Sequence, residues 1–433
     1  MARPPARGGR HGSGRPDDCP VPGSRGEGRL DAENRCPVTP DKAAEKAREL
    51  APRLAARADG YDRAGAFPAE DFADLRTAGL MGLMAPRRLG GVGASFADYT
   101  EVAMALAEGN GATALIYNMH ASVTGALALT PDDVARALGA TEGFFAARDR
   151  LLAATIREGA FYAVAMSERG VGSRLSQVRT AYRPEGGGWR ISGSKTFCSG
   201  AGHADGYLVA ARRSSDGEAV ATEGAVSYFL VPAADGLTVE ETWDSLGMRA
   251  TASHDLHLDV LVPAEALLGG VEGLTLLLAQ AMPQWLVASY AAVYVGVAEA
   301  AIRAAAADGR DRGLGRLPAV RSRLGRADAQ VASAREAVRE AARRVDADPG
   351  APETNRWIWR AKLLAGETAM EVAASMLEAC GAAATRRGNP LERLYRDARC
   401  GSLQPATSDV CADWLGCVAL GLDPERDAEV PRW

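Results

Sequence analysis

The spacing of apolar positions divides the chain into helix-forming and strand-forming parts. From Asp41 apolar residues recur every three to four positions, as in DKAAEKARELAPRLAARAD, and this period continues through Ala112 to Leu129. Between residues 161 and 213 apolar and polar residues alternate between turn signals such as GGG. The pattern predicts an α+β multidomain protein, with an N-terminal all-α domain followed by a middle domain of antiparallel β-strands.

The helical period returns after Gly273. The segments that carry it are Leu274 to Ala307, Leu317 to Val345, Asn355 to Ala382 and Thr407 to Leu420. Alanine dominates them and favours close contact between helices, which predicts a four-helix bundle as the C-terminal domain. We expect domains at residues 41–158, 159–270 and 271–433. Residues 1–40 are rich in Arg, Gly and Pro and almost devoid of large apolar side chains, so they are expected to form a disordered leader.

Composition narrows the function classes. A net charge of -5 argues against nucleic acid as a partner, and no uninterrupted apolar run reaches the length of a membrane span. The seven cysteines lack metal-ligand or disulfide-rich spacing, so reduced thiols and a cytoplasmic location are expected. The five histidines do not cluster, so we expect no metal site.

The loop from Ser167 to Ser173 is the first candidate for chemistry. It follows an apolar strand-like run and reads SERGVGS. Gly170 and Gly172 permit a close approach of backbone, and the two serine hydroxyls can hydrogen-bond. Such a loop suits a polar ring edge or a phosphate, although residues of these types after a strand also make ordinary turns.

Four motifs in this order resemble those of the acyl-CoA dehydrogenase family. They are Ser167-Glu168 with Gly172-Ser173; Gly193, Lys195, Phe197 and Ser199; the segment Leu246 to Gly269; and PLERLYRDAR at Pro390 to Arg399. Together they span most of the chain. The resemblance implies the fold predicted above and an FAD cofactor.

The resemblance also implies positions for the cofactor. The residues expected around the flavin are Met166, Ser167, Gly172, Ser173, Phe197 and Ser199. Arg312, with Arg310 as the alternative, would grip a phosphate of the FAD in a neighbouring subunit, within a homotetramer or homodimer. The glycine motif usual before PLERLYRDAR is replaced by Ala379-Cys380-Gly381-Ala382.

Two further residues are assigned to the substrate pocket by the same resemblance. His120 occupies a helix that faces the flavin pocket in family members, although a histidine on an apolar helix is more often part of the core. Arg249 belongs to the third motif. Arg393, Arg396 and Asp397 of the last motif are expected to form a structural ion-pair network.

The family's catalytic base is missing. Counted from the last motif, the position of the usual glutamate is Pro405, and the alternative position used by some members is Leu286. Neither side chain accepts a proton. Asp409, one helical turn beyond Pro405, is the nearest carboxylate and becomes the candidate base, although an aspartate there also suits the first turn of a helix.

Three functions remain. The leading expectation is FAD-dependent α,β-dehydrogenation of an acyl thioester, on coenzyme A or a carrier protein, with an unknown electron acceptor. The alternative is a flavin monooxygenase on the same fold. Relatives of that kind lack the glutamate, as here, but often use a histidine of the C-terminal domain, and no histidine follows His257. The third is a catalytically degenerate flavoprotein that serves as a binding partner.

Overall fold

The protein is described by a computed structural model, which covers residues 38–215, 218–219 and 226–427. The predicted leader at residues 1–40 lies outside the described part except for its last three residues. Helix α1 begins at Pro40, where a proline at the first helical position needs no hydrogen-bond donor.

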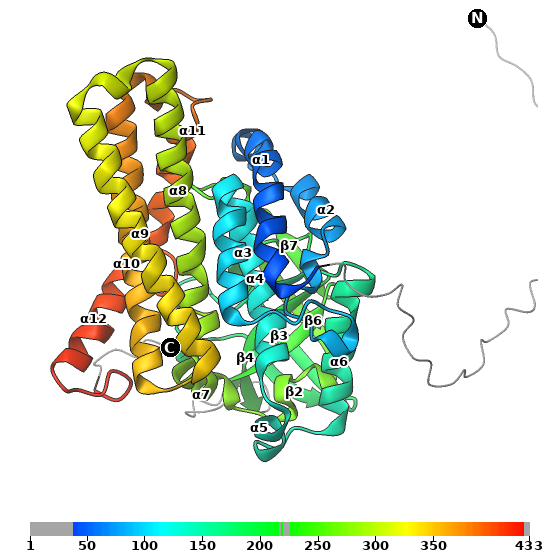
Figure 1. The fold of residues 1–433 in the computed structure, drawn as a ribbon. Coiled ribbons are helices and arrows are strands. Elements are labelled where there is room, and N and C mark those ends of the chain that lie inside the picture. Colours follow the sequence, from blue (N-terminus) through cyan, green and yellow to red (C-terminus); the bar gives the residue numbers. More distant parts are fainter. Residues whose placement is uncertain (1–37, 216–217, 220–225, 428–433) are drawn as a thin grey trace, which may run out of the picture. The chain divides into compact units, whose positions relative to one another are not determined.

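Helices form the N-terminal part. Their bounds are α1 Pro40–Ala64, α2 Ala69–Thr77, α3 Phe96–Gly109, α4 Gly111–Leu129, α5 Asp132–Ala137 and α6 Glu142–Arg157. Helix α4 is buried along nearly its whole length, and Figure 1 shows it beside α3, next to the sheet. A helix that is apolar on all sides must be enclosed by its neighbours, and α4 is therefore placed to form an inner wall of the molecule.

The middle part is a twisted sheet with strand order β1-β4-β2-β3-β8-β7, and β5 and β6 pair with β4. The bounds are β1 Tyr162–Ala165, β2 Ala181–Glu185, β3 Gly188–Cys198, β4 Gly206–Ser215, β5 Glu218–Ala219, β6 Val226–Pro232, β7 Leu237–Glu240 and β8 His254–Pro263. The predicted antiparallel pairing needs one correction. Strand β4 lies between β1 and β2 and is parallel to both, because the chain returns to this position only after completing the β2–β3 hairpin.

The C-terminal part is helical, as predicted. The bounds are α7 Leu274–Ala281, α8 Ala288–Asp311, α9 Pro318–Ala347, α10 Pro352–Cys380, α11 Pro390–Arg399 and α12 Ser408–Ala419. Figure 1 shows α8, α9 and α10 as long neighbouring helices. The first predicted segment, Leu274 to Ala307, is divided: α7 ends before Pro283, and the 3₁₀ turn η8, Pro283–Trp285, separates it from α8. Proline cannot continue a helix, so this break has a local cause.

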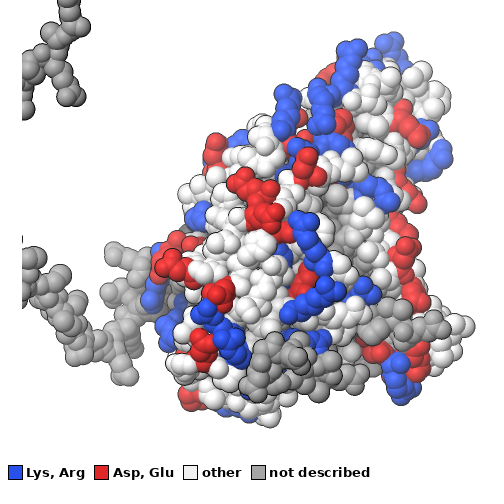
Figure 2. All heavy atoms as spheres, turned by 180° about the vertical axis from the view of Figure 1, so that it is seen from behind, with Lys and Arg blue, Asp and Glu red and all other residues white. Residues whose placement is uncertain are grey.

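From the sequence we expect neither a membrane nor nucleic acid as a partner, and one structural observation bears on each expectation. The helical segment Pro283–Asp311 is long and apolar enough to cross a membrane by length and composition alone, because its few charges hardly interrupt it. However, 78% of its most apolar window is buried in the protein, as in a core helix. On the face shown in Figure 2, acidic and basic side chains both occur over much of the surface.

Candidate functional site

One continuous segment, β1 with the loop after it, borders two cavities. Val164 and Met166 line the first, and residues 168–172 line the second. The loop is closed by hydrogen bonds between Glu168 and Gly172: the Glu168 amide donates to the Gly172 carbonyl at 3.1 Å, and the Gly172 amide donates back at 2.8 Å. Gly172 has a φ of 71°, a left-handed value that favours glycine.

A buried ion pair anchors this loop. The Lys195 ammonium lies 2.8 Å from Glu168 Oε1, and both side chains are almost wholly buried. The same carboxylate accepts the backbone amides of Arg179 at 2.7 Å and Thr180 at 2.9 Å. Burial alone would raise the pKa of Glu168, but Lys195 and these amides outweigh it and hold the pKa below its ordinary value. The loop therefore has a rigid base.

The cavity on the loop side, cavity 2, has a volume of ≈ 660 Å³. It is lined by residues 168–172, Arg174, Thr196, Phe197, Thr242, Trp243, Asp244, Ser253 and Asp255. The register between β3 and β8 shifts between Lys195 and Cys198, and within this irregularity Phe197 has a φ of 56°. Phe197 is 61% exposed and its ring meets the ring of Trp243 edge-on at 6.0 Å. A bulge re-aims a side chain in this way, and it presents an aromatic face to cavity 2.

The predicted flavin residues divide between several places. Gly172 and Phe197 line cavity 2, and Met166 lines cavity 1. Ser167 and Ser173 belong to the loop without lining either cavity. Ser199 is buried, and its hydroxyl lies 2.9 Å from that of Ser253.

The serine that lines cavity 2 is Ser253 rather than Ser199. The sequence assignment missed it, although it belongs to the quoted third motif. Strand register, which sequence alone did not supply, decides which of the two hydroxyls faces the cavity.

The other cavity, cavity 1, has a volume of ≈ 400 Å³ and is predominantly apolar. Its walls come from α4, α5, α6, β1, β4, β6, the 3₁₀ turn η7 (Leu268–Gly270), α7, η8, α8 and the end of α9. The large side chains among them are Met119, Phe144, Met166, Tyr228, Met282, Trp285, Leu286 and Tyr290. Gly125 makes room for Trp285, since a Cβ atom at Gly125 would lie 2.1 Å from the indole ring.

Neither base position supplies a carboxylate. Leu286 lines cavity 1, and Pro405 lines neither cavity. The loop containing Pro405 is held by the buried Lys362, whose ammonium donates to the carbonyls of Gly401 at 2.9 Å and Ala406 at 2.8 Å. This segment therefore has a structural anchor where other family members carry a base.

The candidate base Asp409 is exposed on the first turn of α12 and lines neither cavity. Among the described residues that line cavity 1, Asp346 is the single carboxylate. Its oxygens accept the amides of Phe96 at 2.8 Å and Ala97 at 2.9 Å, at the start of α3. Asp346 therefore caps a helix, and its oxygens are already committed.

His120 is a core residue, which corrects its assignment to the substrate pocket. It is 1% exposed and lines neither cavity. Its Nε2 lies 2.8 Å from the Met81 carbonyl, and its Nδ1 accepts the Tyr162 amide at 3.2 Å. Both contacts suit the neutral ring protonated at Nε2. Burial lowers the pKa of His120 to about 4, so the ring is neutral at neutral pH.

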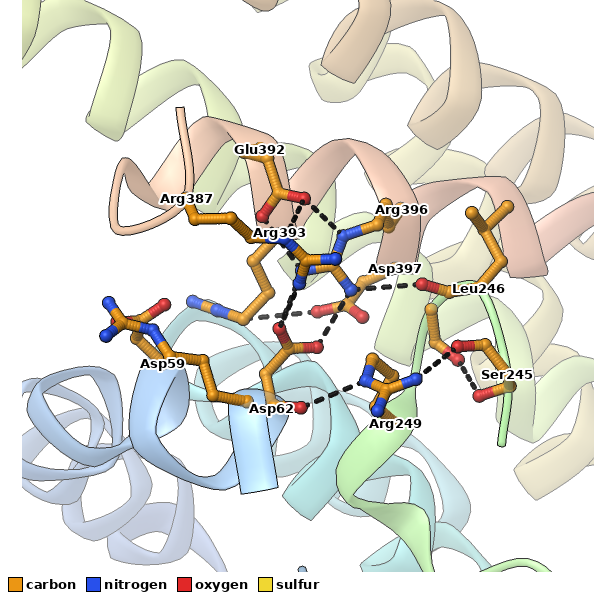
Figure 3. Close-up of polar contacts among 12 residues, drawn as sticks. Asp59, Asp62, Ser245, Leu246, Arg249, Arg387, Glu392, Arg393, Arg396 and Asp397 are labelled. Atoms are coloured by element: carbon orange, nitrogen blue, oxygen red, sulfur yellow. Dashed lines mark hydrogen bonds and ion pairs between the residues drawn. The ribbon is translucent and has the colours of Figure 1, made fainter. Parts of the chain in front are cut away.

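Arg249 likewise lines neither cavity, and its side chain lies in a polar junction between the parts of the fold (Figure 3). Its guanidinium donates to the Asp62 carbonyl at 3.1 Å and to Asp244 Oδ1 at 2.8 Å. The expected substrate contact is replaced by these structural ones, because the side chain extends toward the end of α1.

The same junction confirms the predicted ion-pair network. Arg396 donates to both carboxylate oxygens of Asp62, at 2.9 and 2.6 Å, and joins α11 to α1 (Figure 3). Asp397 accepts the Met248 amide at 2.7 Å and Arg393 at 3.1 Å. The last motif therefore ties the C-terminal helices to the N-terminal helices and to the segment before β8.

Arg312 caps the end of α8. It donates to Asp308 Oδ2 at 2.6 Å and to the Cys380 carbonyl at 2.8 Å, and its side chain is 38% exposed. The contacts hold it beside the segment that replaces the family's glycine motif. Its contact with a neighbouring subunit's cofactor stays a prediction. Among the described residues, no group of three or more His, Cys, Asp or Glu is arranged to hold a metal ion.

Comparison with known proteins places this geometry in context. Models of the acyl-CoA dehydrogenase N-terminal, middle and C-terminal domains match residues 41–133, 163–261 and 284–412. YdbM of Bacillus subtilis (strain 168), provisionally named an acyl-CoA dehydrogenase, is 31% identical over 87% of this chain and 96% of its own length. The L-evernosamine nitrososynthase of Micromonospora sp. is 31% identical over 92% of this chain and 94% of its own.

A solved relative has a different named activity. The dibenzothiophene monooxygenase TdsC from Paenibacillus sp. A11-2 is 26% identical, with a TM-score of 0.74 over 88% of this chain and 97% of its own. One of its structures is a complex with FMN and indole.

Proposed function

The chain belongs to the acyl-CoA dehydrogenase family, and on that premise we propose that it is a flavin-dependent monooxygenase. It would use a reduced flavin and molecular oxygen to oxygenate a small apolar molecule bound in cavity 1. The flavin oxidoreductase class is common to the sequence expectation and to this proposal. The proposed reaction differs from the leading expectation from sequence, which was acyl-thioester dehydrogenation, and corresponds to the alternative given there.

The residues around cavity 2 fit a flavin. The exposed Phe197 ring offers a stacking face, and Ser253 offers a hydroxyl. A Cβ atom added to Gly170 or Gly172 would meet nothing within 4 Å, so the space beside these two lining residues is open. Arg174 supplies a positive charge for a phosphate. The flavin, when bound, supplies the redox chemistry, and the protein supplies binding and orientation.

The observation that carries the proposal is that, among the described residues lining cavity 1, no carboxylate is free of hydrogen bonds. Dehydrogenation of a thioester requires a base within hydrogen-bond reach of the α-proton. Leu286 occupies one family position, and Asp346 is committed to the start of α3. Oxygenation of an electron-rich ring, sulfur or nitrogen does not begin with removal of such a proton. The cavity's residues instead bind the substrate and exclude water.

The relatives support the same choice. Proteins of this family that are similar along most of this chain include a nitrososynthase and a dibenzothiophene monooxygenase, besides YdbM. Sequence resemblance implies FAD, whereas FMN is present in a TdsC structure. We propose a flavin in cavity 2, and chromatography of the cofactor extracted from the purified protein distinguishes FAD from FMN.

One experiment separates the three functions. The flavin-loaded protein is titrated anaerobically with a panel of acyl-CoA thioesters, and then supplied with NADH, a flavin reductase, ¹⁸O₂ and indole. We expect no bleaching by thioesters, and a product that carries one ¹⁸O atom while the other oxygen atom leaves as water. Bleaching by a thioester without reductant would establish dehydrogenation instead. A protein that takes up no flavin would support the binding-partner function.

Self-association is proposed as well. Exposed leucines lie in the C-terminal part, with Leu403 at 56% and Leu420 at 79% exposure. Such side chains suit burial between copies, and Arg312 would then complete a neighbour's flavin site. Sedimentation of the flavin-loaded protein at micromolar concentration should give a tetramer or a dimer, and a flavin-loaded monomer would contradict this. The cytoplasmic location remains a prediction.

A further inference from the structure

We propose that the side-chain amide of Gln284 is the polar recognition point of cavity 1. The substrate class that follows is a neutral apolar molecule with one N–H or O–H group that donates a hydrogen bond to this amide. The inference rests on the proposed function in one respect, namely that cavity 1 is the substrate cavity.

Gln284 has a buried oxygen without a partner. The residue lies in the turn η8 between α7 and α8, lines cavity 1 and is 8% exposed. Its Oε1 has almost no accessible surface and accepts no hydrogen bond. An amide oxygen removed from water in this way is costly unless a donor reaches it. Rotation of the amide about its Cγ–Cδ bond would turn this oxygen toward cavity 1, where a ligand that carries a donor would satisfy it.

The other hydroxyl and carboxylate groups around cavity 1 already have partners. Ser122 donates to the Asn118 carbonyl at 2.8 Å, and Thr130 donates to the Ala126 carbonyl at 2.7 Å. Asp346 accepts two amides at the start of α3.

The two tyrosine hydroxyls of the cavity donate to methionine sulfurs. The Tyr228 hydroxyl lies 3.7 Å from the sulfur of Met166, and the Tyr290 hydroxyl lies 3.8 Å from the sulfur of Met119. Methionine sulfur is a weak acceptor. Among the side-chain oxygens of the described residues that line cavity 1, Gln284 Oε1 is thus the one without any hydrogen-bond partner.

The backbone turn that carries Gln284 is held in place by hydrogen bonds and by packing of the next residue. The backbone amides of Leu286 and Val287 both donate to the Pro283 carbonyl at 2.9 Å, which closes the turn that carries Gln284. The next residue, Trp285, packs edge-on against Phe96 with ring centroids 4.8 Å apart. An acceptor carried on a fixed turn beside large apolar side chains orients a ligand more strongly than it attracts one.

The described side chains around cavity 1 offer no counter-ion, which disfavours ionic substrates. Among the described residues that line cavity 1 there is no lysine or arginine, and both oxygens of the Asp346 carboxylate already accept a hydrogen bond. A charged group moved from water into these walls would have no counter-ion. The chemistry therefore selects a neutral molecule, for example an aromatic amine, an N–H heterocycle or a phenol, and disfavours one whose reacting half is ionised.

Indole and indene provide the test, because they share one shape and differ in the N–H group. Calorimetry with the purified protein should show indole binding about fivefold to tenfold more tightly than indene, as expected for one hydrogen bond. In Gln284→Leu this ratio should fall to about one, while the affinity for indene is kept. Gln330→Leu, which alters an exposed glutamine of α9, is the matched control and should keep the parental ratio.

Three results would overturn the inference. They are equal binding of the two probes by the parent, an unchanged ratio in Gln284→Leu, and failure of both probes to bind at millimolar concentration. Gln284→Met is a second variant if the leucine variant unfolds, and thermal melting checks both. The measurement needs no turnover, so a protein that binds indole through Gln284 yet fails to incorporate ¹⁸O would refute the monooxygenase proposal alone.

Discussion

Cavities 1 and 2 lie along one stretch of chain, yet they are built by opposite means. Charged and polar residues are frequent in the lining of cavity 2, its loop is anchored by a buried ion pair, and glycines with left-handed backbone leave the loop open. Cavity 1 is apolar, and its walls come from eleven different elements and contain, among the described residues, one buried amide oxygen without a hydrogen-bond partner. Backbone conformation therefore shapes cavity 2, and side-chain volume shapes cavity 1.

This difference suggests a division of labour. A cofactor shared by a family needs the same backbone contacts in every member, whereas substrates differ and are selected by the side chains that fill a cavity. Variants of cavity 2 should therefore change flavin content or the stability of the loop. Variants of cavity 1 should change which molecules bind. The predictions below begin with the largest effect.

Breaking the ion pair beneath cavity 2 should have the largest effect. Lys195→Met leaves the Glu168 carboxylate buried without its cation, and we expect the free energy of unfolding to fall by about 3–5 kcal/mol. Urea denaturation measures it. Arg183→Met, which removes an exposed ion pair with Glu185, is the control and should cost less than about 1 kcal/mol. Equal losses in the two variants would contradict a special role for the buried pair.

Acid should weaken the contact that holds β1 between the cavities. The pKa of His120 is about 4 in the folded protein, against 6.5 for the ordinary residue. The unfolded chain therefore gains a proton near pH 6.5 that the folded protein takes up only near pH 4. The free energy of unfolding should fall by about 3 kcal/mol as the pH falls through this window. His120→Gln should lose this part of the dependence in denaturation at several pH values, and an unchanged dependence would refute it.

Cavity 1 should respond to a single methyl group. Gly125→Ala forces the Trp285 ring from its position against α4 and into the cavity, at a cost of about 1–3 kcal/mol in stability. We expect the affinity for indene to fall roughly tenfold, because about one ring's contacts are lost. Gly60→Ala, in α1 with open space around it, should keep the parental affinity and stability or improve the latter. Parental indene binding by Gly125→Ala would place the probe elsewhere.

Cavity 2 should respond through its loop glycine. Gly172→Val introduces a side chain at a φ of 71°, costs about 1–2 kcal/mol and obstructs the ligand side of the loop. The purified protein should be folded and colourless. Gly187→Val, at a φ of 84° in the β2–β3 turn, carries the same strain away from both cavities and should remain yellow. A yellow Gly172→Val protein with parental flavin content would exclude the loop as the flavin site.

The smallest effect is expected at Asp409. Because this carboxylate is exposed on the first turn of α12, Asp409→Asn should change the free energy of unfolding by less than about 0.5 kcal/mol and leave turnover unaltered. Denaturation and stopped-flow flavin reduction measure the two. If Asp409 instead acted as the base of a dehydrogenase, flavin reduction by a thioester would slow by orders of magnitude, with stability unchanged.

The motifs of the sequence predicted cavity 2 better than cavity 1. Gly172 and Phe197 were singled out by motifs that resemble those of the family, and both line cavity 2, while their contact with a flavin stays a prediction. The ion-pair network of Arg393, Arg396 and Asp397 was predicted from one helical motif and is confirmed. Gln284 was missed, because a glutamine in a short apolar turn carries no signal until distant elements enclose it.

The sequence by itself determined the family, the order of helical and β parts, and the absence of a proton acceptor at Pro405 and Leu286. These properties depend on residue type and on spacing along the chain. The tertiary structure alone decided that His120 and Arg249 serve the fold, that Ser253 replaces Ser199 at cavity 2, and that β4 lies between β1 and β2. The reason is that burial, hydrogen-bond partners and strand register arise from contacts between residues far apart in sequence, which no local pattern encodes.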